Sequence, residues 1–142
     1  MKLFIDDERY PVEPGWVYVS NAKDAITELR LCRDRGERIE HISYDHDLGE
    51  QTSRDVMNWQ ARNGVYPEVA SIHSSNPVGR EWLTQALTND FDEAIPIVEA
   101  PEYVRRQNVW PATQLQIFTA PPAAPTRVDC GGNHILLTLL CA

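Results

Sequence analysis

Two pairs of aspartates are the residues of this chain that are best suited to chemistry. Asp6 and Asp7 follow a short apolar run at the start of the sequence, and Asp45 and Asp47 follow a second one. Carboxylates that meet at one site repel one another unless a positive charge compensates them. An all-oxygen set suits Mg²⁺ or Mn²⁺, and the bound ion can contact the oxygens of a phosphate group. All four aspartates are therefore candidate ligands of a divalent metal that handles a phosphorylated substrate.

Histidines, arginines and small polar residues near these aspartates could complete a catalytic site. Imidazole titrates near neutral pH, so His46 and His73 are candidates for moving protons, together with Asp45. The candidates for binding phosphate are two arginines and the polar groups before a predicted helix, namely Arg9, Ser74, Asn76 and Arg80. Each of these side chains also has an ordinary structural use, in a loop, as a helix cap or on the surface.

The elements that must position these residues alternate between strands and helices. Short apolar runs predict five strands, at residues 2–5, 16–19, 41–44, 68–73 and 94–98. Apolar residues at helical spacing predict three helices, which follow a cap at Ser20 or Asn21, a cap at Thr52 or Ser53, and the loop before Pro77. Such alternation predicts a parallel sheet covered on both faces by helices.

Parallel sheets bind their ligands beyond the carboxyl ends of the strands. Asp6, Asp45 and His73 each follow a predicted strand, so we expect three distant segments to converge on one edge of the sheet. Two prolines and a glycine in residues 8–15 forbid a regular helix and predict a loop there. Pro96 restricts the fifth strand to an edge or an end of the sheet.

A length of 142 residues suits one domain with an appendage. The α/β pattern occupies residues 1–100, and residues 101–142 are predicted to be a C-terminal extension of unknown structure. The extension contains a stretch rich in proline and alanine and a short apolar run at residues 135–140. The sequence leaves the role of this extension open.

Charge and composition narrow the function classes. The net charge of −8 argues against a broad nucleic-acid surface, which relies on lysines and arginines. It is compatible with a small phosphorylated ligand, because a metal ion reverses the local field at an acidic cluster. The apolar run at residues 135–140 is far shorter than the roughly 20 residues of a membrane span. Three scattered cysteines are typical of reduced thiols, so we expect a cytoplasmic protein without a membrane segment.

Three ordered segments resemble the cyclic-phosphate processing receiver-like family, a divergent branch of the receiver domains of bacterial response regulators. They are FIDDER at residues 4–9, ISYDHDLG at residues 42–49 and IHSSNPVGR at residues 72–80. The resemblance implies a receiver-like (flavodoxin-like) α/β fold of three layers with a mainly parallel five-stranded sheet. It also implies a bacterial or phage origin and a role in processing cyclic phosphates on nucleotides or RNA ends.

The resemblance also implies roles for single residues. Asp6 and Asp7 match the receiver acidic pair that holds a divalent cation, and Asp45 matches the aspartate that accepts phosphate. The other motif residues match branch-specific elements or the receiver hydroxyl position: His46 and Asp47 in DHD, His73 and Asn76 in HSxN, and Ser74 near the hydroxyl.

Two departures separate this chain from an ordinary receiver. Residues 8–15 are too short and too rich in proline for the first receiver helix, which is therefore predicted to be degenerate or missing. Residues 94–101 contain no lysine, although a receiver carries one at the end of strand five. Ordinary phosphorelay signalling through Asp45 is disfavoured, because the lysine is a principal phosphate contact.

Two function classes remain. The first is a metal-assisted phosphoesterase (a cyclic phosphodiesterase) that acts on a small phosphorylated ligand or an RNA terminus. The alternative is a non-catalytic receiver-like protein that sequesters a ligand or inhibits a protein partner. A weaker enzymatic variant rests on two HxS triplets that begin at His41 and His73, as in two-histidine phosphoesterases. We expect those two histidines to lie at opposite edges of the sheet, because one begins a strand and the other follows one.

Overall fold

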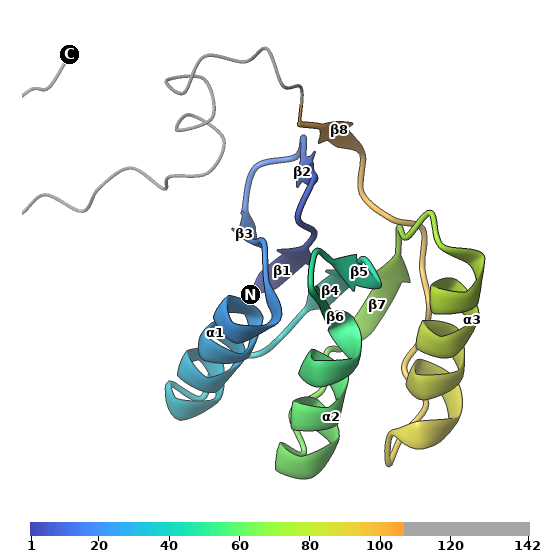
Figure 1. Cartoon of the computed structure of the whole chain (residues 1–142). Helices are drawn as coiled ribbons and strands as arrows, with labels where there is room; N and C mark the ends of the chain where they lie inside the picture. The colour runs from blue at the N-terminus through green and yellow to red at the C-terminus, as the bar shows by residue number, and fades with distance from the viewer. Residues whose placement is uncertain (107–142) are drawn as a thin grey trace, which may run out of the picture. The chain divides into compact units, whose positions relative to one another are not determined.

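The computed structural model describes residues 1–106, which are organised around a four-stranded parallel sheet (Figure 1). The strands lie in the order β3-β1-β4-β7, with bounds Trp16–Val19, Lys2–Ile5, His41–Tyr44 and Val69–Ile72. Every neighbouring pair is parallel. The predicted α/β class and the predicted parallel sheet are confirmed, and the four strands lie where the apolar runs indicated.

Three helices connect the strands, and a polar side chain caps each of them. They are α1 (Ala22–Asp34), α2 (Ser53–Asn63) and α3 (Pro77–Gln85), which continues into the π-helical turn η1 (Ala86–Asp90). The cap side chains of Asn21, Thr52 and Asn76 accept hydrogen bonds from backbone N–H groups of the first turns. Each cap satisfies a backbone donor that a helix otherwise leaves unpaired, and this fixes where the chain turns from strand to helix.

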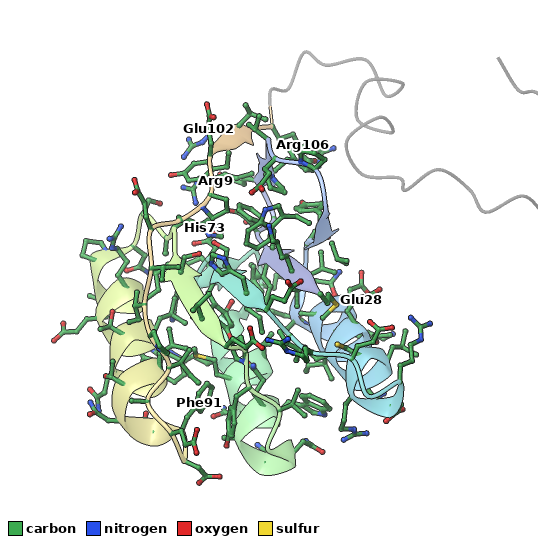
Figure 2. All side chains as sticks on the ribbon, turned by 180° about the vertical axis from the view of Figure 1, so that it is seen from behind. Arg9, Glu28, His73, Phe91, Glu102 and Arg106 are labelled. Carbon is green, nitrogen blue, oxygen red and sulfur yellow. The ribbon has the colours of Figure 1, made fainter. Side chains whose placement is uncertain are left out.

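All three helices pack on the same face of the sheet (Figures 1 and 2). Alternate residues of a strand point to opposite faces. The side chains of Leu3, Ile5, Ile42 and Tyr44 are fully buried against the helices and form the main core. The opposite face therefore carries the other set of strand residues, and within residues 1–106 no helix covers it.

The predictions of a fifth strand and a third layer are not realised in residues 1–106. The segment at residues 94–98 forms a single parallel bridge between Ala70 and Ile97. Pro96 has no N–H to donate, so the segment adds only two ladder bonds, from Ala70 N–H to the Pro96 carbonyl (2.9 Å) and from Val98 N–H to the Ala70 carbonyl (2.8 Å). The segment between β1 and β3 forms no helix, as predicted, so within residues 1–106 it adds nothing to a second helical layer.

A short antiparallel ribbon replaces that helix. β2 (Arg9–Pro11) lies in the segment predicted as a loop, and it pairs with β8 (Tyr103–Arg105). Pairing therefore continues beyond residue 100, while the division of the chain at that residue stays a prediction, since residues 107–142 lie outside the described part. A second small hairpin joins β5 (Asp47–Leu48) to β6 (Gln51–Thr52). Within the described part, no helix combines the length and the apolar character that crossing a membrane requires.

Candidate functional site

The carboxyl ends of β1 and β4 bring three of the predicted acidic residues together. Asp6 and Asp45 directly follow the paired residues Ile5 and Tyr44. One carboxylate oxygen each from Asp6, Asp7 and Asp45 lie within 4.8 Å of one another. Asp47, the fourth predicted metal ligand, does not belong to this group. The segments converge because parallel strands end at the same edge of the sheet.

Asp6 is fully buried and accepts four hydrogen bonds. Its Oδ1 accepts from the backbone N–H groups of Glu8 (2.7 Å) and Arg9 (2.8 Å), and its Oδ2 accepts from Arg9 Nη1 (3.2 Å) and His73 Nε2 (2.9 Å). Burial raises the pKa of Asp6, but the bonds from His73, Glu8 and Arg9 outweigh it and leave the pKa below its ordinary value. Asp6 is therefore a buried anion.

Arg9 supplies the positive charge of the site (Figure 2). Its guanidinium is buried, with Nη1 at 3.2 Å from Asp6 Oδ2 and 3.7 Å from Asp45 Oδ2. The same group donates to the carbonyl of His73 (3.2 Å) and to Ser75 Oγ (3.3 Å). Arg9 therefore places a cation from β2 between two of the aspartates.

The pKa values of Asp45 and Asp7 are raised, whereas that of Asp6 is lowered. Burial raises the pKa of Asp45, a hydrogen bond from Ser74 offsets part of this effect, and the Asp6 charge adds to it. Burial also raises the pKa of Asp7. Both carboxylates would thus be stabilised as anions by a further cation. The oxygen set fits Mg²⁺ or Mn²⁺ chiefly through Asp7 and Asp45, since Asp6 already uses its acceptor capacity for four donors.

His73 is buried below Asp6, and both of its ring nitrogens are engaged. Nε2 lies 2.9 Å from Asp6 Oδ2, and Nδ1 lies 2.7 Å from Ser43 Oγ. The ring stacks on Phe4, with 4.3 Å between the ring centroids. In this position His73 holds Asp6, and its nitrogens point to protein partners rather than into solvent.

The hydrogen bonds continue from His73 along the helix-free face of the sheet. Ser71 Oγ donates to Ser43 Oγ (2.8 Å), and His41 Nε2 lies 2.8 Å from Ser71 Oγ. His41, which is half-buried, and His73, which is buried, are therefore the two ends of one polar row that crosses β4 and β7. They lie at opposite ends of the strands, as the sequence indicated, so the two histidines do not face a common ligand.

We expect His41 to make the stability of the protein depend on pH below about 6.5. Burial lowers the pKa of His41, the charge of Lys2 lowers it further, and Glu13 opposes this. The neutral ring also contacts Trp16 and Ser71. A depressed pKa in the folded state means that the unfolded chain binds more protons, so stability falls as the pH drops below the ordinary histidine value of about 6.5.

We expect the free energy of unfolding to decrease more steeply with acidification in the wild-type protein than in His41→Gln, whose side chain cannot titrate. Urea denaturation at pH values from about 8 to about 5 measures both slopes around the ordinary histidine pKa. Equal slopes would show that His41 has the same pKa in the folded and unfolded chains.

His46 and Asp47 belong to a second hydrogen-bonded group. Arg54 Nε donates to His46 Nε2 (3.2 Å), and His46 Nδ1 lies 2.8 Å from Asp47 Oδ1. Asp47 Oδ2 accepts from Asn76 Nδ2 (3.0 Å), and Asn76 Oδ1 accepts from the N–H of Gly79 (3.1 Å). This group joins the turn after β4 to the first turn of α3, which gives the DHD and HSxN motifs a structural use.

The hydrogen bonds of Asp47 also lower its pKa, first through Asn76 and then through His46. Asp47 is exposed and lies apart from the three clustered aspartates, so its carboxylate serves the turn rather than that cluster. His46 is buried with both nitrogens engaged, like His73.

The remaining predicted phosphate contacts lie at different depths. Ser74 is buried, hydrogen-bonds to Asp45 and accepts from the N–H of Asn76 (3.3 Å). Arg80 is exposed, and its Nη1 donates to the carbonyl of Ser74 (3.2 Å). Ser74 and Arg9 therefore border the acidic cluster directly, whereas Arg80 reaches it only through the backbone of Ser74.

Sequence reasoning missed Ser43, Ser71 and Tyr103 as neighbours of the site. A signal for the two serines was present, because HIS at residues 41–43 and SIH at residues 71–73 place polar side chains in buried strands. Burying a polar group requires a hydrogen-bond partner, so each serine implied one. Tyr103 gave no such signal, since it lies in a short segment far from the motifs.

A sequence model of a known protein family matches residues 1–89, which is more than half of the chain. The family is described as the cyclic-phosphate processing receiver domain. The matched range includes every residue of the predicted site, whereas β8 lies beyond it. No curated protein and no solved structure matches the chain.

Proposed function

The chain belongs to the cyclic-phosphate processing receiver domain family, and from this premise we propose that it is a metal-assisted phosphoesterase that opens a cyclic phosphate on a nucleotide or an RNA end. The observation that carries the proposal is the meeting of Asp6, Asp7 and Asp45 around the buried Arg9. Oxygen ligands for a divalent ion and a fixed cation side by side are what a phosphate anion requires.

The proposed metal ligands are Asp7 and Asp45, with Asp6 beside them. A bound divalent ion would supply charge that polarises the phosphoryl group. The buried Arg9 guanidinium, which Asp6 orients and which donates to His73 and Ser75, would add a fixed positive charge beside the phosphate. Ser74 would hold the Asp45 carboxylate through the hydrogen bond between them. His73 keeps Asp6 in place, and His46 keeps the turn after β4 in place, so both histidines are positioning residues in this proposal.

The proposed reaction is the addition of water to phosphorus. One ester bond of the cyclic phosphate breaks, and a phosphate monoester and a free hydroxyl result. Asp45 would accept the proton of the attacking water through the carboxylate oxygen that does not hold the ion. Asp45 would release this proton to solvent and return to its starting state, and a water molecule would protonate the leaving oxygen.

We expect nucleoside 2′,3′-cyclic phosphates, or RNA that ends in one, to be hydrolysed in the presence of Mg²⁺ or Mn²⁺ and not in the presence of EDTA. Asp45→Asn should lower kcat/KM by roughly 100-fold or more, the scale of general-base catalysis. The matched control is Asp55→Asn, an exposed aspartate of α2 that should leave the rate unchanged. Absence of turnover over a broad panel of cyclic phosphates would refute the enzymatic proposal.

A second candidate is a binding protein without turnover. It is favoured by one observation, namely that both nitrogens of His46 and of His73 are engaged by protein groups. Equilibrium binding of a cyclic phosphate that Arg9→Gln abolishes, with the ligand recovered unchanged, would establish this alternative. A single stoichiometric protein partner in a pull-down, retained by Asp6 and Asp45 variants, would point to an inhibitor instead.

A further inference from the structure

The ribbon of β2 and β8 places a second arginine beside the proposed site. Arg105 is the direct cross-strand partner of Arg9, and Tyr103 is the partner of Pro11. Directly opposed residues of an antiparallel pair have their side chains on the same face. Arg9 points to Asp6 and Asp45, so Arg105 and Tyr103 lie on the ribbon face that borders the aspartates.

The pairing of Arg9 with Arg105 is electrostatically unfavourable by itself. Like charges in directly opposed positions destabilise a strand pair. Arg9 is compensated by Asp6, but Arg105 is exposed, and no carboxylate of residues 1–106 lies within salt-bridge distance of it. A phosphate held near Arg9 would give Arg105 the negative partner that residues 1–106 do not supply.

Tyr103 adds an aromatic surface at the same place. Its ring centroid lies 5.6 Å from the guanidinium carbon of Arg9 and 5.6 Å from the ring centroid of His73. Phe4 lies below it, at 6.4 Å between centroids. Tyr103 is still 41% exposed, so part of the side chain remains open to a ligand. Aromatic side chains beside cationic ones are the usual platform for a nucleobase, because every base has a flat π face.

We propose that Tyr103 stacks on the base of a nucleotide while Arg105 contacts its phosphate from the outer side. This inference rests on the proposed function and narrows its substrate class to nucleoside cyclic phosphates, as opposed to cyclic phosphates without a base. It also assigns recognition of the base to β8, which lies outside the residues that the family model matches.

The test compares two ligands that resemble products of ring opening and bind without reacting, adenosine 3′-monophosphate and the base-free ribose 3-phosphate. Calorimetric titration of the full chain with Mg²⁺ should show the nucleotide binding about tenfold more tightly, as base stacking would give. Tyr103→Ala should remove this tenfold preference and leave ribose 3-phosphate binding within twofold, and Tyr103→Phe should retain it.

Arg105→Gln should weaken the binding of both ligands by a similar factor of roughly 10 to 100, the scale of a charge-assisted hydrogen bond. The matched control is Arg106→Gln, because strand alternation places Arg106 on the other face of the ribbon. Equal binding of the two ligands, unaltered by Tyr103→Ala, would overturn this inference and leave the proposed function intact. Absence of binding by both ligands, together with absence of turnover, would overturn the proposed function and this inference together.

Discussion

Replacing Arg9 with methionine lowers the free energy of unfolding by about 3–5 kcal/mol in metal-free buffer, which is the expected cost of removing one partner from a buried ion pair. Methionine keeps much of the apolar stem, so the loss reports the charge. Asp6 would remain fully buried with one cationic donor fewer, and Asp45 would lose the guanidinium at 3.7 Å. Urea denaturation with EDTA measures the change.

Magnesium should restore part of this loss in Arg9→Met, because a divalent ion can neutralise the freed aspartates. An ion present at 100 times its dissociation constant contributes about 2.7 kcal/mol. The matched control is Arg38→Met, which removes an exposed ion pair with Glu68 and should cost no more than about 1 kcal/mol. A loss at Arg9 as small as that at Arg38 would mean that the aspartates need no fixed cation.

Gly79→Ala should be the most damaging small substitution in α3, with a cost of roughly 3 kcal/mol, at the upper end of the range for overpacking. A Cβ at this position would lie 2.4 Å from Cγ, 2.6 Å from Cβ and 2.8 Å from Nδ1 of His46. The ring has little freedom to move away, because Asp47 and Arg54 hold its two nitrogens. The midpoint of urea denaturation at constant slope gives the cost.

Two further variants identify the cause of that cost. Val78 precedes Gly79 in α3, and its side chain is 69% exposed. Val78→Ala should therefore change the free energy of unfolding by less than about 0.5 kcal/mol. His46→Gly removes all three of the crowded atoms, so the double variant should be less destabilised than the sum of the single ones. Simple additivity would show that α3 does not press against His46.

Local sequence signals were sufficient to predict the elements that are long enough to show an apolar run or a helical spacing of apolar residues. β1, β3, β4 and β7 are apolar runs of ordinary length, and the helices begin at side chains that accept from the first turn. The ribbon could not be predicted in this way. β2 and β8 have three residues each and lie far apart in the chain, so neither shows an alternation that a sequence can reveal.

The prediction of a fifth strand was not confirmed, for a related reason. Residues 94–98 have the apolar composition of a strand, but Pro96 removes a donor, and only one bridge forms. Composition records which side chains prefer a sheet, whereas pairing also requires backbone N–H groups at the correct register. The fifth strand is therefore not confirmed, although one bridge places the segment beside β7.

The site divides in the same manner. The meeting of the aspartates follows from a general rule on strand ends, so it could be expected from sequence. The roles of His46 and His73 could not be predicted from sequence, because they depend on which groups form hydrogen bonds with the two ring nitrogens. Ser43 forms such a bond with His73, and Arg54 forms one with His46. The residues next to each histidine in the sequence do not indicate these partners.

The hydrogen bonds of the polar row from Asp6 to His41 all run in one direction. A serine hydroxyl has one proton to give, and a carboxylate can only receive. When His73 is neutral, its Nε2–H donates a hydrogen bond to Asp6, so its Nδ1 must accept one from Ser43. Ser43 Oγ then accepts from Ser71, and Ser71 Oγ accepts from His41 Nε2. The charge on Asp6 thus dictates which nitrogen of His41 is protonated, through hydrogen bonds that run from one end of the strands to the other.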